Sequence, residues 1–219
     1  MVETNTVEDL YNKILSTTAK ELFIEAKRAL DRADKKTKEL EEELSAAREY
    51  LNRFELVTQA SDKTFLVDLD GTVFKFDFGA DYTVPGYFRN RPIQQGVVDV
   101  ITNLHKAGNK IKIITAAIDE QAALDKAAQS KEVFPFLKDG DIIIVPYGMK
   151  KTDFIPKGYK YILIDDYTPN LRDAAEAGIE PVKVFNGING TKGTYRKDFP
   201  YGKSFNINDK PEDVIICII

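Results

Sequence analysis

Glycine and proline are missing from the first seventy residues of this 219-residue chain. All thirteen glycines and all nine prolines lie at or beyond Gly71. Because these residues interrupt regular elements and form the turns of strand-and-loop folds, their absence excludes such a fold at the front of the chain. We therefore expect a helical arm over residues 1–60, followed by one ordinary domain over residues 61–219.

Cysteine and long apolar runs are also scarce. Cys217 is the single cysteine, which excludes an internal disulfide framework and favours a reducing compartment. No apolar run approaches membrane-spanning length, and the polar N-terminus lacks the apolar segment of a signal peptide. We therefore expect a cytoplasmic protein that does not bind a membrane.

An excess of one charge is absent as well. The chain has 31 basic and 35 acidic residues, a net charge of -4, and no polybasic block. This balance predicts no attraction to anionic lipid and no nucleic acid polymer as a partner. A content of 43% hydrophobic and 30% charged residues is typical of a soluble globular protein and excludes a disordered one.

The front segment carries one apolar stripe at helical spacing. Steps of four and three residues alternate along it, the a/d pattern of a coiled-coil seam. Its members are Ala19, Phe23, Ala26, Leu30, Ala33, Thr37, Leu40, Leu44, Ala47, Leu51 and Phe54. Thr6 and Asp9 can form a capping box before it. The pattern predicts a helix from about Thr6 to about Val57, roughly 75 Å long at 1.5 Å per residue.

A helix of that length exceeds one domain face, because a domain of the remaining size is on the order of 40 Å across. Either the helix pairs with another copy, making residues 7–57 the contact of a homo-oligomer, or it folds back as a helical hairpin. The fold-back would come near Asp34–Thr37, where the stripe is weakest. We favour an oligomerisation or packing element, with a lid over an active site as the alternative.

Beyond Lys63, short apolar runs alternate with helix-like stretches. The runs are near-continuous, as in strands buried on both faces of a parallel sheet; they are Phe65–Leu69, Ile111–Thr115, Ile142–Val145, Tyr161–Ile164 and Val182–Phe185. The helix-like stretches are Gly96–Lys106, Asp119–Ser130 and Asn170–Ala177. This alternation predicts an α/β fold with a doubly wound parallel sheet, in which ligands bind at the carboxyl ends of the strands.

Carboxylates follow two of these runs. Asp68 and Asp70 end the first run just before a Gly-Thr pair, and Asp165 and Asp166 follow the fourth. Such a cluster is costly unless something positive balances it, and hard oxygen ligands select Mg²⁺ shared with a substrate phosphate. Caps of local turns are the simpler interpretation of each pair taken alone.

A hydroxyl and two ammonium groups are expected at the same edge. Thr115 ends the second run, and Lys150 and Lys151 follow the third. A carboxylate can attack phosphorus, a second can transfer protons, and these groups can hold the phosphoryl oxygens. A solvated pair of surface lysines is the alternative for Lys150 and Lys151. The run Asn186–Thr194, "NGINGTKGT", matches no phosphate-loop spacing and is better explained by turns.

The stretches "VDLDGT", "IKIIT" and "YILIDD", with a lysine before the last, resemble the motifs of the haloacid dehalogenase (HAD) superfamily of phosphohydrolases. They occur in the order of that family and span Phe65 to Asp166. The resemblance implies a HAD-like Rossmannoid fold and a Mg²⁺-dependent phosphomonoester hydrolase with an aspartyl-phosphate intermediate.

The same resemblance implies residue roles. Asp68 would be the nucleophile and Asp70 the general acid/base. The metal would sit on Asp68, the backbone carbonyl of Asp70, and either Asp165 or Asp166.

It also implies that Thr115 and Lys151 bind the phosphoryl group, with Lys150 the adjacent alternative to Lys151.

A narrower similarity links "PGYFRNRPIQQGVVDVITNLHKAG" and "MKKTDF" to the 5'(3')-deoxyribonucleotidase-like branch, including phage and bacterial members. It implies a small-molecule phosphomonoester as partner, most simply a nucleotide. The better-known members carry a helical cap after the first motif, but only a short segment separates Phe76 from Arg91 here. Aromatic residues crowd that segment and either pack a flap or stack on a base; they are Phe74, Phe76, Phe78, Tyr82, Tyr87 and Phe88.

A non-catalytic role is the alternative to an enzyme. The arm would then build an assembly, and the phosphatase-like domain would be a retained scaffold. Asp70 discriminates between the two, because superfamily members that have given up hydrolysis often lose the acid/base residue. Its presence favours the enzyme.

Overall fold

The computed structural model describes residues 6–58, 62–77, 79–188 and 200–219. The chain divides into two compact units, Met1–Arg53 and Phe54–Ile219. Phe78 and residues 189–194 of the predicted turn run lie outside the described residues. Among the residues described, no helix is both long and apolar enough to cross a membrane.

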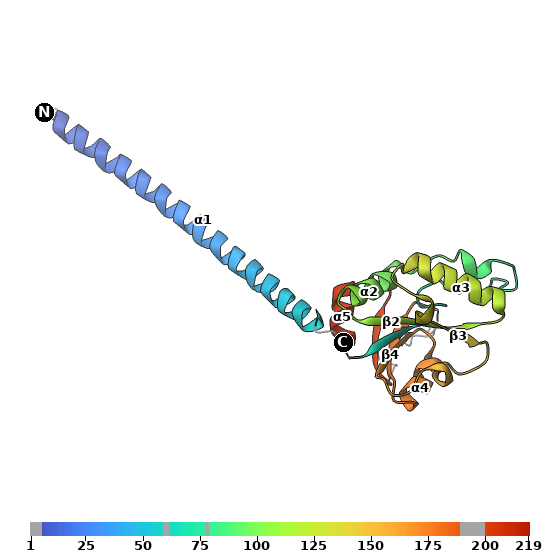
Figure 1. The fold of residues 1–219 in the computed structure, drawn as a ribbon. Helices are drawn as coiled ribbons and strands as arrows, with labels where there is room; N and C mark the ends of the chain where they lie inside the picture. Colours follow the sequence, from blue (N-terminus) through green and yellow to red (C-terminus); the bar gives the residue numbers. More distant parts are fainter. Residues whose placement is uncertain (1–5, 59–61, 78, 189–199) are drawn as a thin grey trace. The chain divides into compact units, whose positions relative to one another are not determined.

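The front of the chain is one unbroken helix, α1, which runs from Val7 to Thr58 (Figure 1). Its 52 residues correspond to about 78 Å at 1.5 Å per residue. Thr6 caps it as predicted: the Asp9 amide donates to the Thr6 hydroxyl at 3.4 Å, and the Thr6 amide donates to the Asp9 carboxylate at 3.3 Å. The arm is thus one long helix and not a helical hairpin, because the chain does not fold back between Val7 and Thr58.

The described part of the second unit contains a six-stranded parallel sheet in the order β3-β2-β1-β4-β5-β6. The strands are β1 (Thr64–Val67), β2 (Lys110–Ala117), β3 (Ile142–Pro146), β4 (Tyr161–Asp165), β5 (Glu180–Phe185) and β6 (Lys203–Asn206). This confirms the predicted doubly wound α/β fold. The chain adds strands on one side of β1 and then returns to the other side with β4, so the order reverses between β1 and β4.

Helices cover both faces of the sheet. They are α2 (Gln95–Lys106), α3 (Glu120–Val133), α4 (Thr168–Glu176) and α5 (Pro211–Ile218), with short 3₁₀ turns η1 (Tyr87–Arg89), η2 (Asp139–Asp141) and η3 (Lys151–Phe154). Helices α2, α3 and α5 lie on one face and α4 on the other (Figure 1).

The core follows from the alternation of side chains along buried strands. Phe65 and Val67 of β1 join the cluster under α2 and α5, whereas Leu66 points to the opposite cluster under α4. Ile162 and Leu163 of β4 alternate in the same way. Burial on both faces explains why these runs are continuously apolar.

Element bounds depart from the prediction in a few places. β1 ends at Val67, so Leu69 lies beyond it, and β2 continues to Ala117, which places Thr115 inside the strand rather than at its end. The prediction omitted β6 and α5. β6 is short and only half apolar, with Phe205 its one fully buried side chain, so it lacks the continuous run of the inner strands.

Candidate active site

The candidate site lies where the strand order reverses. Asp68 directly follows β1, and Asp165 and Asp166 stand at the end of β4, the strand paired with β1. The carboxyl ends of parallel strands at such a reversal flank a crevice, the usual ligand site of doubly wound folds. The fold therefore brings together the carboxylates that the sequence placed after two separate strands.

Three of these carboxylates form a buried triad. Asp68, Asp165 and Asp166 are 5%, 0% and 1% exposed, and each offers one oxygen within 4.8 Å of the others. Buried carboxylates at this separation repel one another unless a cation balances them. The triad consists only of hard oxygen donors, so its chemistry suits a divalent cation such as Mg²⁺.

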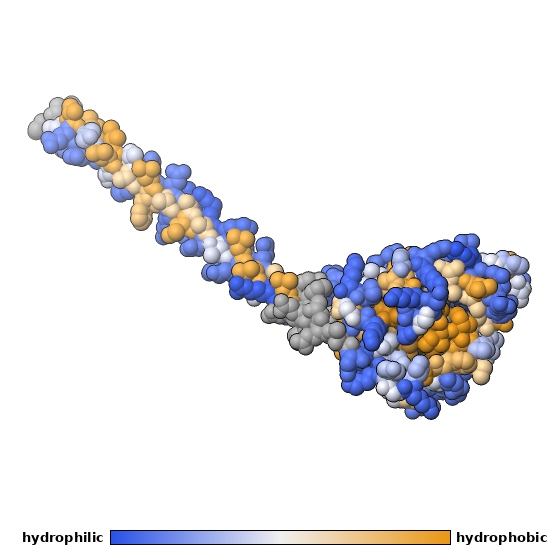
Figure 2. All heavy atoms as spheres, viewed as in Figure 1, coloured by the Kyte–Doolittle hydropathy of each residue, from blue (hydrophilic) through white to orange (hydrophobic). Residues whose placement is uncertain are grey.

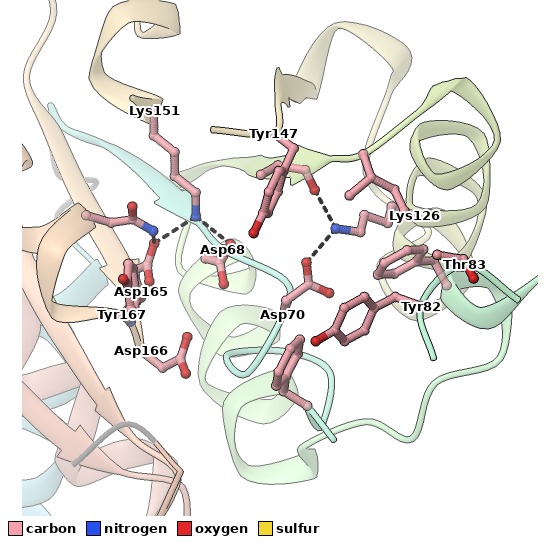
Figure 3. Close-up of a pocket in the computed structure, with 15 residues that line it drawn as sticks. Asp68, Asp70, Tyr82, Thr83, Lys126, Tyr147, Lys151, Asp165, Asp166 and Tyr167 are labelled. Carbon is pink, nitrogen blue, oxygen red and sulfur yellow. Dashed lines mark hydrogen bonds and ion pairs between the residues drawn. The ribbon is translucent and has the colours of Figure 1, made fainter. Parts of the chain in front are cut away.

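Lys151 supplies one positive charge inside the triad. Its ammonium donates to Asp68 Oδ1 at 2.5 Å and to Asp165 Oδ2 at 2.7 Å (Figure 3). Burial alone would lower the pKa of Lys151, but the Asp165 and Asp68 carboxylates outweigh it and raise that pKa. Lys151 is therefore a permanent cation at this point.

Two ammonium groups do not neutralise three carboxylates: Lys151 contacts Asp68 and Asp165, and the buried Lys183 donates to the backbone carbonyl of Asp166. Burial raises the pKa of Asp68 well above its usual range, and Lys151 opposes this rise only in part. The nearby charges of Asp165, Asp70 and Asp166 add to it. The Asp68 carboxylate thus lies in a region with excess negative charge, which a bound cation would relieve.

Asp166 is held by neutral donors. The Thr72 hydroxyl donates to its Oδ1 at 3.3 Å, and the Asn186 amide donates to its Oδ2 at 2.8 Å. Gly71 adopts a left-handed conformation with φ of 82°, and a Cβ there would overlap the Asp166 carboxylate. The Gly-Thr pair after Asp70 therefore both makes the turn and supports Asp166.

Asp165 is saturated by protein donors. Besides Lys151, Asn170 donates to its Oδ2 at 2.9 Å, and the Tyr167 amide donates to its Oδ1 at 2.7 Å. Both oxygens are thus already engaged by a cation or an amide. The neighbouring aspartates thus differ in their contacts: the Asp165 carboxylate accepts from Lys151, whereas the Asp166 carboxylate accepts from Thr72 and Asn186 and its backbone carbonyl accepts from Lys183.

Asp70 points away from the triad. Its Oδ1 accepts from Arg91, and its Oδ2 accepts from Lys126 at 2.5 Å (Figure 3). Both cationic side chains are only 4% exposed, whereas that of Asp70 is 23% exposed. The structure therefore places the Asp70 carboxylate with two cations and outside the group that can share a metal ion.

The sequence interpretation missed Arg91, Lys126 and Asn186. Lys126 lies on the same buried face of α3 as Ala122 and Gln129, and a lysine at core spacing was an available signal. Asn186 directly follows β5, so its position at the active edge of the sheet was also accessible. Arg91 precedes α2 in an irregular segment and gave no such signal.

Thr115 is buried within β2 and its hydroxyl oxygen has no hydrogen-bond partner among the described residues. Thr115 is not itself among the residues that line the cavity, but its neighbour Ala116 is. Buried hydroxyl groups are normally paired, so the unpaired Thr115 hydroxyl can take a further partner. A phosphoryl oxygen would satisfy it. This is consistent with the phosphate-binding role that the resemblance implies.

Lys150 lies apart from Lys151. Its ammonium pairs with Asp173 of α4 at 3.3 Å, and its side chain is 61% exposed. Of the two lysines, only Lys151 contacts the carboxylate cluster. The structure thus brings together Asp68, Asp165, Asp166 and Lys151, but not Lys150.

A cavity of about 520 Å³ opens beside the triad. Asp68, Asp70, Lys126 and Lys151 lie along its polar side. Its apolar wall consists of Phe76, Tyr82, Phe88, Ile118, Tyr147 and Tyr167. Of the other predicted aromatics, Phe74 belongs to the core. The aromatic residues of the short segment after β1 therefore divide between two places, with Phe74 in the core and Phe76 and Tyr82 in the cavity wall.

The comparison with solved structures found proteins of similar fold. The structure of D,D-heptose 1,7-bisphosphate phosphatase from B. bronchiseptica, complexed with magnesium and phosphate, matches with a TM-score of 0.50 at 15% identity, covering 70% of this chain and 96% of that chain. The enzyme of the same name from Burkholderia Thailandensis matches with a TM-score of 0.48, the same identity and the same coverage. No family model and no curated protein sequence matches the chain. The α/β unit thus has the fold of a phosphatase, at low sequence identity.

Proposed function

We propose that the chain is a Mg²⁺-dependent phosphomonoester hydrolase that works through an aspartyl-phosphate on Asp68. The observation that carries this proposal is the buried triad of Asp68, Asp165 and Asp166, with Lys151 in contact with two of its carboxylates, at the mouth of an open cavity. The HAD-like motifs and the fold of the phosphatase complexed with magnesium and phosphate support the same function.

Asp68 and Asp166 would hold the metal, with the backbone carbonyl of Asp70 added by the resemblance. Asp165 is the weaker candidate because Lys151, Asn170 and the Tyr167 amide already occupy its oxygens. Bound Mg²⁺ would offset the charge of the carboxylates and of a phosphate ester.

The chain's own residues suffice to describe the proton and phosphoryl transfers. An Asp68 oxygen attacks phosphorus, and the bond from phosphorus to the ester oxygen breaks as that oxygen takes a proton from the Asp70 carboxyl group. Asp70 must enter this step protonated, so one of its oxygens exchanges the cationic contact it makes in this structure for the proton. Asp70, now ionised, takes a proton from a water molecule whose oxygen attacks the same phosphorus. The bond between phosphorus and Asp68 then breaks, which releases inorganic phosphate and restores the Asp68 carboxylate.

Two groups would hold the phosphoryl oxygens during these steps. Lys151 is a buried cation in contact with the nucleophile, and the Thr115 hydroxyl has a free donor. Donors already in place where negative charge develops stabilise the transition state more than donors that must reorganise.

A nucleotide is the substrate that the cavity favours. Its volume of about 520 Å³ suits a small molecule, and planar rings of Phe76, Tyr82 and Tyr147 line its wall. A nucleobase has a flat apolar face that can stack on such rings, whereas a sugar phosphate presents hydroxyl groups. We assign the chain a 5'-nucleotidase-like preference on this ground, and a cytoplasmic location on the ground of its single cysteine.

A non-catalytic scaffold is the second candidate. The exposed apolar residues of α1 favour it, because they suit an assembly role. Asp70 remains in place and is fixed by two buried cations, which favours the enzyme.

The test measures phosphate release from nucleoside 5'-monophosphates and from sugar phosphates, with Mg²⁺ or with a chelator. We expect turnover with Mg²⁺ only, a preference for nucleotides, and none in Asp68→Asn. Asp166→Asn should raise the Mg²⁺ concentration needed more than Asp165→Asn does. Metal-independent turnover, or wild-type turnover in Asp68→Asn, would overturn the mechanism; a preference for sugar phosphates would overturn only the substrate assignment.

A further inference from the structure

The apolar stripe of α1 is exposed along the described helix. Phe23, Leu30, Leu44 and Leu51 are 72%, 62%, 51% and 57% exposed. Figure 2 shows apolar residues following one another along α1. Large apolar side chains exposed in such a row are unusual for an isolated helix in water and mark a contact surface.

The spacing of the stripe assigns heptad positions from Ala19 onward. Position a holds Phe23, Leu30, Thr37, Leu44 and Leu51, and position d holds Ala19, Ala26, Ala33, Leu40 and Ala47. Alanine at d lets two helices approach closely. The one polar residue in the seam, Thr37, donates its hydroxyl to the Ala33 carbonyl of its own helix at 2.9 Å, so it can face a partner without an unpaired donor.

The flanking charges favour a second copy of the same helix, parallel and in register. In that arrangement a g residue faces the e residue five positions later in the partner. Lys36 then faces Glu41 of the other copy, and Glu43 faces Arg48. Two-fold symmetry makes each attractive pair twice. The other g residues from Ala19 onward that the structure describes with their side chains, Leu22 and Ala29, are uncharged, so this register brings no like charges together.

We propose that α1 forms a parallel, in-register coiled coil with α1 of a second copy of this chain. The a/d seam covers the exposed stripe, and the pairs of Lys36 with Glu41 and of Glu43 with Arg48 set the direction and register. This proposal does not depend on the proposed enzymatic activity.

Sedimentation velocity of the full chain tests the pairing. Lys36→Glu turns two attractive contacts into repulsive ones and should weaken the dimer ~10-fold or more. Adding Glu41→Lys should restore it. Lys35→Glu is the matched control. Lys36 and Lys35 both pair with Glu39 of their own helix, at 3.5 Å and 4.0 Å, but Lys35 lies at position f, away from the seam. A monomeric wild type, or equal weakening by Lys36→Glu and Lys35→Glu, would overturn the proposal.

Oxidative crosslinking tests the direction. In a Cys217→Ser background, which removes the exposed native thiol, Ala19→Cys places one thiol at a d position near the front of the seam. A parallel dimer brings the two thiols together and should form a disulfide-linked dimer. A dimer that does not crosslink would show an antiparallel arrangement and overturn the proposal.

A second inference concerns the residues around Asp70 and rests on the proposed function. Arg91 is fixed by contacts to Asp70 and to the Lys75 carbonyl, and its guanidinium lies 5.6 Å and 5.3 Å from the ring centres of Phe76 and Tyr87. Lys126 contacts Asp70 and the Ala116 carbonyl, with its ammonium 4.4 Å from the ring centre of Phe88. Two nearly buried cations thus fix both oxygens of one carboxyl group.

The two cations differ in access to the cavity. Lys126 lines it and Arg91 does not. From this geometry we infer that Lys126 is a positioning residue: it directs Asp70 toward the ester oxygen that leaves, while Arg91 anchors the other oxygen. A fixed position of the Asp70 carboxyl group matters because proton transfer requires this group to lie within hydrogen-bond distance of the leaving oxygen.

The test compares esters whose leaving groups need a proton to different degrees. Nitrophenolate is stable enough to leave as an anion. The 5'-oxygen of a nucleoside must gain a proton in order to leave. Lys126→Met should therefore lower kcat/KM for the nucleotide ~10-fold more than for p-nitrophenyl phosphate. Lys126→Arg should recover part of the difference. Lys131 lies on the same helix but pairs at the surface with Asp139, so Lys131→Met should leave kcat/KM for both esters unchanged.

The outcomes separate the two ideas. Equal losses for both esters in Lys126→Met would show a merely structural role and overturn the positioning inference while leaving the hydrolase intact. A wild-type chain that hydrolyses neither ester would overturn the proposed function, and the positioning inference with it.

Discussion

At the scale of single residues, the site is a balance of buried charges. Lys151 contacts Asp68 and Asp165, and Lys183 donates to the Asp166 carbonyl, whereas the single carboxylate of Asp70 contacts two cations, Arg91 and Lys126. The negative excess lies on the triad side, where a metal ion would bind. The positive excess lies beside Asp70, next to the aromatic wall of the cavity.

Removal of the Thr115 hydroxyl is expected to affect activity and stability differently. Thr115→Val keeps the shape of the side chain but removes a buried hydroxyl that has no partner in the described structure. Replacing an unpaired buried polar group by an apolar one is neutral or stabilising, so the melting temperature should hold or rise. Loss of a phosphoryl contact should lower kcat/KM ~10-fold or more. Thermal unfolding with phosphatase kinetics checks both, and unchanged kinetics would remove Thr115 from the site.

Gly71 allows a matched experiment on the support of Asp166. Gly71→Ala combines the strain of a left-handed backbone with a clash against the Asp166 carboxylate, whereas Gly148→Ala has the same strain, with φ of 87°, and open space around its Cβ. Gly148→Ala should cost about 1 kcal/mol. Gly71→Ala should cost more and should also weaken Mg²⁺ binding, measured by the metal-induced shift in melting temperature. Equal effects of the two substitutions would contradict the clash.

Of the residues that the sequence placed at strand ends, Asp68 and Asp165 lie there, whereas Thr115 lies inside β2. The sequence placed Asp68 and Asp165 correctly because a buried parallel strand and the residues after it form one local pattern. It could not place Arg91 beside Asp70, because that contact joins residues 21 positions apart through an irregular segment. Nor could it separate Asp165 from Asp166, because only their donors distinguish them.

At the scale of elements, the inner strands and the helices between them followed from sequence, whereas the edge did not. β1, β2 and β4 are continuous apolar runs, but β6 has partly exposed residues and belongs to the sheet because β5 offers it a free edge. The sequence also could not show that α1 is a single helix, because a helical hairpin would have the same apolar stripe.

The segment between β1 and α2 provides part of the cavity wall and makes an element-level prediction. Tyr82 lies on it, 40% exposed and lining the cavity, and contacts Phe76 with ring centres 6.0 Å apart. Tyr82→Ala should raise the KM for nucleoside monophosphates ~10-fold, because a stacking contact is lost. The KM for small aliphatic phosphates should stay the same. Tyr159→Ala, at a more exposed tyrosine away from the cavity lining, is the control. An equal rise in KM for both substrate classes would exclude base stacking.

At the scale of the whole molecule, we expect the two units to have separate tasks, self-association in the first and hydrolysis in the second. The residues that form the triad, the cavity and the three described core clusters all lie in residues 62–219. A chain restricted to residues 62–219 should therefore keep kcat/KM within about twofold of the full chain while losing self-association. Steady-state kinetics and sedimentation on the same samples check this. Loss of activity with the fold intact would assign α1 a part in catalysis, as in the lid alternative.

The reversal of strand order between β1 and β4 has a consequence for variants of the site. The cavity at that point results from the order of the strands. It should therefore remain when an acidic residue that lines it is replaced. A variant that lacks the Asp68 carboxylate is therefore expected to keep the cavity and its aromatic wall, and to hold a small molecule without converting it.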